Sequence, residues 1–153
     1  MYRQYGFIAP RSELATNADE AAAKALAIGF PVALKIVSPD IIHKTDVGGV
    51  ELGLASADDV QAAFRRIQTS VRDKAPEARI KGIAVEEMCA GGTEIIIGLN
   101  NDPQFGPTIM FGLGGIFAEA LHDVRFRVLP ITTANAADMI DGIQGRAILE
   151  GYR

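Results

Sequence analysis

The chain has 153 residues, which is enough for one compact domain with its own hydrophobic core and too few for two. Hydrophobic residues make up 48% of it and charged residues 22%, as in ordinary globular proteins. The formal net charge is −4, and the 15 Lys and Arg residues form no cluster in the sequence. This argues against a nucleic-acid-binding protein, because affinity for the phosphate backbone depends on clustered basic residues.

Two further features bear on location. Cys89 is the only cysteine, so the chain can form no internal disulfide and no cysteine-built metal site. Residues 1–10 lack the apolar segment of a signal peptide, and no apolar run approaches the roughly 20 residues that span a bilayer. We therefore expect a cytoplasmic protein that does not contact a membrane.

The spacing of apolar residues and the positions of turn residues predict the helices and strands. In chain order these are a helix at about 19–28, strands at 32–37 and 50–54, a helix from the Ser56 cap to about Ala75, strands at 80–88, 93–99, 107–111 and 126–129, and a helix at 133–141. A tight turn at 90–92 is predicted to join the strands at 80–88 and 93–99. Because hairpin-connected strands outnumber β-α-β units, we predict an α+β fold: a layered, mostly antiparallel sheet with helices packed on it.

Several common nucleotide and metal motifs are missing. The glycine cluster at 112–115 lacks the third glycine of the dinucleotide fingerprint, and Lys44-Thr45 follows His43 instead of the glycine of a P-loop. With two His and one Cys, a zinc site built from these side chains is improbable.

Lys35 stands alone in the apolar strand at 32–37. An unpaired ammonium in a protein core costs several kcal/mol, so a lysine in this position normally has an anionic partner. One interpretation is that Lys35 binds nucleotide phosphates. The other is that it extends to water from a strand edge.

The loop at 39–49 has a composition that suits phosphate. It contains His43, Lys44, Thr45 and the pair Gly48-Gly49, and glycines let backbone N–H groups approach phosphate oxygens closely. The alternative is a long, solvated connection between two strands.

The acidic stretch at 86–94 is typical of an adenosine site. A strand end at Glu87-Met88 can offer backbone groups to adenine, and Glu94 can accept from ribose hydroxyls. Glu86 and Glu87 are adjacent on a strand, so only one of them can face the ligand. The alternative is a surface acidic pair.

The last group of candidates follows the glycines at 112–115. Glu119 and Asp123 are four residues apart, so on a helix they share a face, which is either a magnesium-binding pair or a solvated surface. Arg127 lies within an apolar strand, where arginine often neutralises a bound anion. His122 is expected to be structural or exposed.

Taken in order, these elements resemble a known family. The stretch LKIVSPDIIHKTDVGGV at 34–50 resembles the signature of the ATP-grasp domain in ADP-forming acetyl-CoA synthetases. The later stretches that fit are Glu87-Met88, residues 102–107, residues 111–116, Phe126-Arg127 and Leu129-Pro130. The family is similar to the β subunit of succinyl-CoA synthetase, and some fused protein acetyltransferases carry the domain in a non-catalytic role.

The resemblance implies two α+β lobes that hold ATP, and the reaction of acyl-CoA, ADP and phosphate to give a carboxylic acid, CoA and ATP. It implies that His43 carries the phosphoryl group, with Mg²⁺ on the nucleotide phosphates. The remaining ATP-binding residues that it implies are Lys35, Gly48, Gly49, Glu87, Met88 and Glu94. Lys44 and Arg127 join them on the residue arguments above.

One part of the family pattern is missing. The magnesium-binding Asp-x-Asn-Pro type of strand lies near the end of the ATP-grasp domain and is not found before Arg153. We therefore expect an ATP-grasp domain at 1–153 that is incomplete at its C-terminus, binds Mg·ATP weakly alone, and works with CoA-binding and ligase domains or a subunit. Three hypotheses for function remain. The chain is the phosphoryl-transfer part of an acyl-CoA ligase, or a non-catalytic nucleotide- or acyl-CoA-sensing module of a fused acetyltransferase, or part of another ATP-grasp ligase that forms an acyl-phosphate for amide synthesis and would not need His43. A sensor needs no nucleophile in its loop, so His43 favours the ligase.

Overall fold

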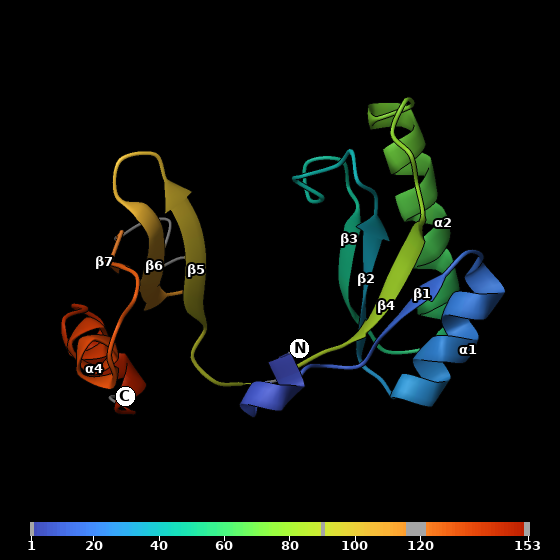
Figure 1. The fold of residues 1–153 in the computed structure, drawn as a ribbon. Coiled ribbons are helices and arrows are strands. Elements are labelled where there is room, and N and C mark those ends of the chain that lie inside the picture. The colour runs from blue at the N-terminus through green and yellow to red at the C-terminus, as the bar shows by residue number, and fades with distance from the viewer. Residues whose placement is uncertain (1, 90, 116–121, 152–153) are drawn as a thin grey trace. The chain divides into compact units, whose positions relative to one another are not determined.

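The computed structural model describes residues 2–89, 91–115 and 122–151, and it divides the chain into two compact units (Figure 1). The first unit is Met1–Ala90 and the second is Gly91–Arg153. Each unit has a sheet and a hydrophobic cluster of its own, so each is described by itself.

The first unit contains a four-stranded antiparallel sheet. Its strands are β1 (Ser12–Ala15), β2 (Val32–Val37), β3 (Val50–Leu54) and β4 (Gly82–Glu87), and their order across the sheet is β1-β4-β2-β3. A short 3-10 helix, η1 (Tyr2–Tyr5), precedes β1. The two central strands are therefore β4 and β2, and β2 carries Lys35.

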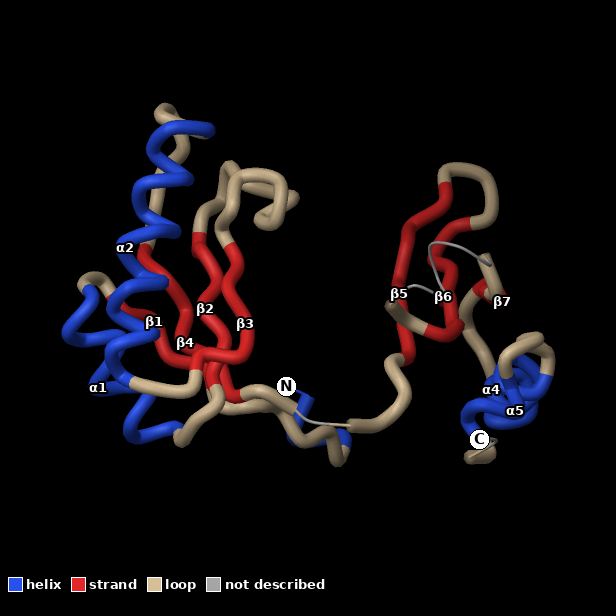
Figure 2. The backbone as a smooth tube through the Cα atoms, turned by 180° about the vertical axis from the view of Figure 1, so that it is seen from behind, coloured by secondary structure: helices blue, strands red, loops and turns tan. Residues whose placement is uncertain are grey.

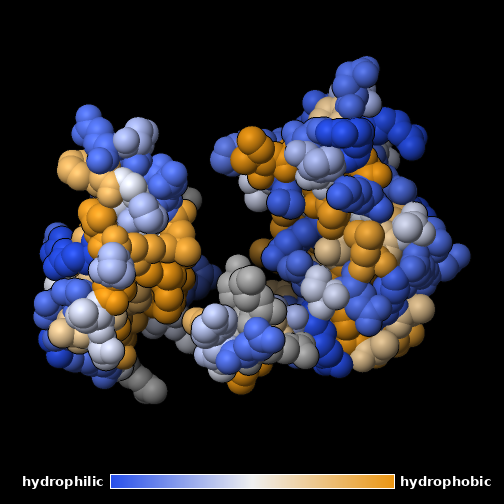
Figure 3. Space-filling view, viewed as in Figure 1, coloured by the Kyte–Doolittle hydropathy of each residue, from blue (hydrophilic) through white to orange (hydrophobic). Residues whose placement is uncertain are grey.

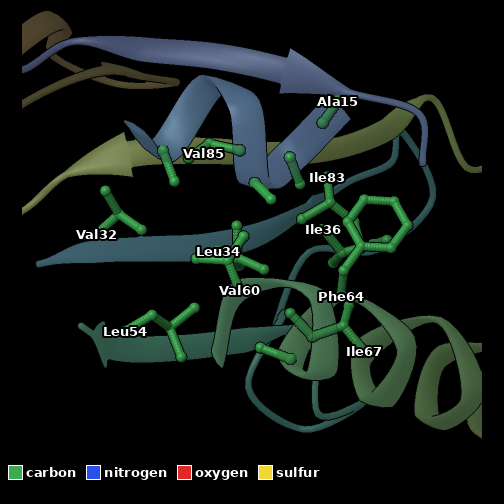
Figure 4. Close-up of a cluster of buried hydrophobic side chains, with 14 of the residues drawn as sticks. Ala15, Val32, Leu34, Ile36, Leu54, Val60, Phe64, Ile67, Ile83 and Val85 are labelled. Atoms are coloured by element: carbon green, nitrogen blue, oxygen red, sulfur yellow. The ribbon is translucent and has the colours of Figure 1, made fainter. Parts of the chain in front are cut away.

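Two helices, α1 (Ala18–Ile28) and α2 (Ala57–Lys74), lie on the same side of this sheet in both views (Figures 1 and 2). Each begins where a side chain accepts a hydrogen bond from a backbone N–H of the first turn: Asn17 caps α1 and Ser56 caps α2. In α2 the buried residues recur at helical spacing, which turns one stripe of the helix toward the sheet. The core of the unit lies between this stripe and β2 and β4 (Figure 4); its largest fully buried members are Val32, Leu34, Ile36, Val60, Phe64, Ile67, Val71, Ile83 and Val85.

The second unit contains a three-stranded antiparallel sheet in the order β5-β6-β7. Its strands are β5 (Ile95–Asp102), β6 (Gly106–Leu113) and β7 (Val124–Val128), and they are followed by α4 (Thr133–Asp141) and α5 (Arg146–Leu149). Its buried cluster is small: Phe111, Leu113, Met139 and Ile143. Hydrophobic side chains gather on the surface of this unit (Figure 3), and β5 contributes several of them.

The structure confirms the α+β class, the antiparallel pairing and all three predicted helices. The capping box at Thr132 and Asn135, which begins α4, is complete. Three short elements were not predicted: η1, β1 and α5. Among the described residues, no helix has the length and apolar character needed to cross a membrane.

The predicted hairpin between the strands at 80–88 and 93–99 is wrong. These strands correspond to β4 and β5, which belong to different sheets. The physical reason is that β1 and β2 already occupy both edges of β4, so no edge remains for β5. β5 pairs with β6 instead, through a turn in which Asp102 accepts from the N–H groups of Gln104 and Phe105. Residue 90, in the predicted turn, lies outside the described residues.

Candidate functional site

The sheet of the first unit has one face covered by helices, and Lys35 lies on the other. Leu34 and Ile36 point into the core, so the alternation of a strand turns Lys35 to the opposite face. There Lys35 Nζ is 2.6 Å from Oε2 of Glu86 on β4, and Ser12 on β1 donates to Oε1 of Glu86 at 3.3 Å. The Lys35 side chain is 41% exposed and that of Glu86 is 25% exposed.

The expectation that Lys35 has an anionic partner is met within the protein by Glu86. The alternative of a lysine at a strand edge does not apply, because β2 is a central strand. Three strands thus place a cation, a carboxylate and a hydroxyl on one solvent-accessible sheet face. The Lys35 amine is held within the sheet and is accessible to solvent.

Glu87 is engaged elsewhere. Its carboxylate accepts from the backbone N–H of Arg11 at 3.1 Å and from the Arg11 guanidinium at 3.3 Å. These contacts, the backbone bond first, lower the pKa of Glu87 below its ordinary value. Glu86 therefore shares the sheet face of Lys35 and Glu87 does not. Which of the two faces a ligand stays a prediction.

The backbone at this strand end is also occupied. The N–H of Glu87 donates to the carbonyl of Arg11 at 2.9 Å, so it is not available to adenine in this structure. The sulfur of Met88 accepts from the N–H of Gly53 at 3.0 Å, which ties the strand end to β3. The adenine-binding role of this segment stays a prediction.

The loop that connects β2 to β3 carries His43. Ile41 is buried, whereas Ile42 is 82% exposed and His43 is also exposed. His43 forms no hydrogen bond or ion pair with any residue that the structure describes. Lys44, beside it, is half-buried, and its carbonyl accepts from the N–H of Gly49 at 2.7 Å. The imidazole is therefore free to react with a group in solvent.

The glycine pair is engaged within the loop in this structure, and its phosphate-binding role stays a prediction. The N–H of Gly48 donates to the carbonyl of Thr45 at 3.0 Å, and that of Gly49 donates to the carbonyl of Lys44. Gly48 has φ +65°, and a Cβ there would collide with the Ser70 side chain; a Cβ on Gly49 would lie 2.5 Å from Ile36. The pair thus serves the packing of the loop, and phosphate binding through its N–H groups would require both hydrogen bonds to open.

Asp40, at the start of this loop, accepts three hydrogen bonds from Arg79, which lies in the connection between α2 and β4. Its Oδ2 accepts from the backbone N–H of Arg79 at 2.8 Å and from Nε at 2.9 Å, and its Oδ1 accepts from Nη2 at 2.6 Å. These bonds, those of the guanidinium first, lower the pKa of Asp40 from 3.8 to about 2.

This shift predicts how the contact depends on pH. Since the folded-state pKa is depressed, the contact contributes fully above pH 3.8 and is lost as the pH falls toward 2. A carbon-13 NMR titration of the Asp40 carboxyl is expected to give a midpoint near 2 in the wild type and a clearly higher one in Arg79→Ala, still below 3.8 because the backbone N–H of residue 79 remains. Glu20, whose pKa is lowered to about 2 chiefly by Lys24, should be unchanged in that variant. A wild-type midpoint near the ordinary value contradicts the contact.

In the second unit, Glu94 lies beside the glycine-rich end of β6. The N–H of Gly114 donates to the carbonyl of Glu94 at 2.7 Å. Gly115 has φ +58°, and a Cβ there would lie 2.8 Å from Oε2 of Glu94. The glycines allow this close approach, and the exposed carboxylate of Glu94 is available to a ligand. Its role toward ribose stays a prediction.

Arg127 is not buried among apolar residues. It is exposed on β7, an edge strand, and its guanidinium donates to the carbonyl of Phe126 at 2.9 Å. The argument that a buried arginine needs an anion therefore does not apply to it. An anion-binding role for Arg127 stays a prediction.

The sequence predicted that Glu119 and Asp123 share one face of a helix. This is wrong for Asp123, which does not lie in a helix. This residue precedes β7, is 3% exposed, and accepts from the N–H groups of Gln144 at 2.8 Å and Gly145 at 2.7 Å. Both oxygens thus hold the turn between α4 and α5, and Asp123 has a structural role. Glu119 lies outside the described residues. His122 is exposed, as expected, with φ 49°.

Within the described ranges, no group of three or more His, Cys, Asp or Glu side chains could hold a metal ion.

The sequence did not predict the contacts of Arg11 and Arg79. Each pairs with a carboxylate far away in the chain, and neither residue stands in a recognisable motif.

Comparison with known proteins identifies the family. The family model of the ATP-grasp domain matches residues 1–153. The chain is 47% identical over 149 residues to acetate–CoA ligase [ADP-forming] I of Archaeoglobus fulgidus, covering 97% of this chain and 22% of the relative. It is 46% identical to the β subunit of acetate–CoA ligase [ADP-forming] I of Pyrococcus furiosus, covering 97% of this chain and 64% of that subunit.

A solved structure shows the same fold. The dinucleotide-forming acetyl-coenzyme A synthetase 1 of Ca. Korarchaeum cryptofilum, in complex with coenzyme A, Ca-AMPCP and HgCl+, has a TM-score of 0.91 and 47% identity, with 99% of this chain and 66% of that chain covered. The chain thus spans about two thirds of the subunit and structure it matches, and 22% of the Archaeoglobus ligase. The chain belongs to the ATP-grasp family, and the relatives it resembles are ADP-forming acyl-CoA ligases.

Proposed function

We propose that this chain is the nucleotide-binding and phosphoryl-transfer part of an ADP-forming acyl-CoA ligase. The observation that carries the proposal is the exposed imidazole of His43 on the loop between β2 and β3, which has no hydrogen-bond or ion-pair partner among the described residues, in a unit whose open sheet face presents Lys35. The relatives at 46 to 47% identity are ligases of this class, which supports the same reaction type here.

The chemistry proposed for His43 is a reversible phosphoryl transfer. A neutral ring nitrogen attacks the γ-phosphorus of ATP; a P–N bond forms, the P–O bond to the β-phosphate breaks, and ADP leaves with that oxygen. In the direction of ATP synthesis, the β-phosphate oxygen of ADP attacks phospho-His43, and the imidazole is released. Such a transfer depends mainly on positioning and on neutralising phosphate charge.

The other residues are assigned to the nucleotide. Lys35 is proposed to leave Glu86 and bind a phosphate oxygen, and Lys44 adds a second positive charge beside His43. Glu87 and Met88 are proposed at the adenine, Glu94 at the ribose, and Gly48, Gly49 and Arg127 at the phosphates. For Glu87, Gly48 and Gly49 this requires the existing hydrogen bonds to exchange on binding.

Mg²⁺ is proposed only as the cation that accompanies ATP. The described residues supply no cluster that fits a metal, and the oxygens of Asp123 already bind backbone N–H groups. No step is therefore assigned to a protein-bound metal.

The proposed partners are CoA-binding and acyl-binding domains or a subunit, and the proposed location is the cytoplasm. Together with this chain, those partners form what is called the intact ligase below. The part of the relatives that this chain does not match supports such partners.

The test is an assay of the intact ligase with ADP, phosphate and a panel of acyl-CoA thioesters, with ATP as the measured product. ATP formation that depends on all three substrates is expected. If the protein binds ATP but forms none, and no phosphate appears on His43 when ATP is supplied, the chain is a nucleotide sensor and the ligase proposal fails.

A further inference from the structure

The loop between β2 and β3 is anchored at both ends, and Ile42 and His43 lie exposed between the anchors. At its start, Asp40 binds Arg79 through three hydrogen bonds, and Ile41 is buried. At its end, Ser70 on α2 donates to the carbonyl of Val47 at 2.8 Å. Between these anchors lie residues 42–46, with His43 exposed among them.

The Asp40 anchor differs from an ordinary surface ion pair. A single exposed contact between charged side chains contributes little, because solvent screens it and both side chains lose freedom. Here the guanidinium binds both carboxylate oxygens, and the backbone N–H of the same arginine adds a third bond. Bidentate pairs of this kind fix geometry as well as energy.

The anchor also joins two connections that meet nowhere else through a charged pair. Asp40 follows β2, whereas Arg79 lies between α2 and β4, 39 positions later. Nearby, the N–H of Lys81 donates to the carbonyl of Val37 at 2.8 Å, which holds the two connections side by side. Ala78, next to Arg79, packs against the buried cluster formed by β2, β4 and α2, which ties this connection to the core.

We propose that Asp40 and Arg79 are positioning residues that hold the loop so that His43 projects toward the phosphate donor. His43 is three residues from Asp40, so the carboxylate fixes where the exposed stretch begins. This rests on the proposed function, because it assigns the anchor to the phosphorylation of His43. Neither residue touches the reacting atoms; they act through the loop.

The first measurement concerns the loop alone. Hydrogen–deuterium exchange of the 153-residue chain is expected to be faster at residues 40–46 in Arg79→Ala and in Asp40→Asn than in the wild type. Arg66→Ala is the matched control, because Arg66 forms a bidentate pair with Glu51 on β3, at 2.9 and 2.5 Å, that leaves the Asp40 end of the loop untouched. Equal exchange in all four proteins overturns the anchor.

The second measurement concerns His43. In the intact ligase, Arg79→Ala is expected to slow formation of acid-labile phosphate on His43 by about 10- to 100-fold, because a shift of about 1 Å in a reacting group has an effect of this size. The Mg·ATP dissociation constant should change by less than about threefold, since Arg79 does not contact the nucleotide. Arg79→Lys keeps the positive charge but lacks the planar guanidinium that binds both carboxylate oxygens. This variant should therefore recover only part of the phosphorylation rate.

The outcomes separate the two proposals. If the wild type is never phosphorylated on His43, the proposed function fails, and the exchange data still decide whether the anchor orders the loop. If the wild type is phosphorylated and Arg79→Ala and Asp40→Asn match its rate, the positioning role is overturned. If both variants lose ATP affinity and rate together, the residues act on the nucleotide, and the positioning role is again wrong.

Discussion

Replacing His43 by alanine is expected to abolish acid-labile phosphate on this chain and to reduce ATP formation by the intact ligase by about 10³-fold or more. The substitution removes the nucleophilic nitrogen, for which neighbouring Lys44 and Thr45 offer no equivalent at neutral pH. The measurement is incorporation of labelled phosphate from ATP, followed by mapping to the tryptic peptide at 36–44, which contains His43 as its only histidine.

His122→Asn is the matched control. His122 is the only other histidine of the chain, and asparagine tolerates its φ of 49°. This variant should keep wild-type phosphorylation. His43 is exposed and forms no hydrogen bond or ion pair with the described residues, so His43→Ala should keep the wild-type unfolding midpoint and Mg·ATP affinity. Undiminished phosphate in His43→Ala would show that another group carries it.

The first unit could be predicted well because its signals are local. The helix at 57–74 follows from Ser56 and a stripe of apolar residues at helical spacing, and the strand at 32–37 follows from its apolar run. The short strand β1 has only one buried residue, Ala15, so it carries no apolar pattern. Its place in the sheet depends on pairing with β4, about 70 residues away, which no local pattern indicates.

The partners of the candidate residues could not be predicted. The sequence pointed to Lys35 because it stands alone in an apolar strand, and to His43 because its loop resembles the family signature. It did not indicate that Glu86 would pair with Lys35, because the diagonal contact depends on the register of β2 and β4. Similarly, the glycines at 48 and 49 indicated a close approach of phosphate, and the sequence did not indicate that they also allow close packing against Ser70 and Ile36. A glycine indicates a close approach and does not say what approaches.

Replacing Lys35 by methionine is expected to weaken Mg·ATP binding to the intact ligase by about 10- to 100-fold. A hydrogen bond from a charged group contributes about 1.5–3 kcal/mol, and each 1.4 kcal/mol changes an affinity tenfold. Methionine keeps the length and apolar stem of the side chain, so the core beneath β2 is undisturbed. Isothermal titration calorimetry measures the dissociation constant, and Lys81→Met, at an exposed position of the same unit, should leave it unchanged.

A second substitution, at Glu86, tests the same prediction more strictly. In Lys35→Met, the carboxylate of Glu86 loses the cation 2.6 Å away and adds repulsion toward the polyphosphate. The double variant Lys35→Met/Glu86→Gln should therefore bind Mg·ATP several-fold more tightly than Lys35→Met alone, and the double-mutant cycle isolates the coupling. If Lys35→Met binds Mg·ATP as tightly as the wild type, the Lys35 ammonium pairs with Glu86 within the sheet and does not bind the nucleotide. The nucleotide must then be bound by residues other than those on this face.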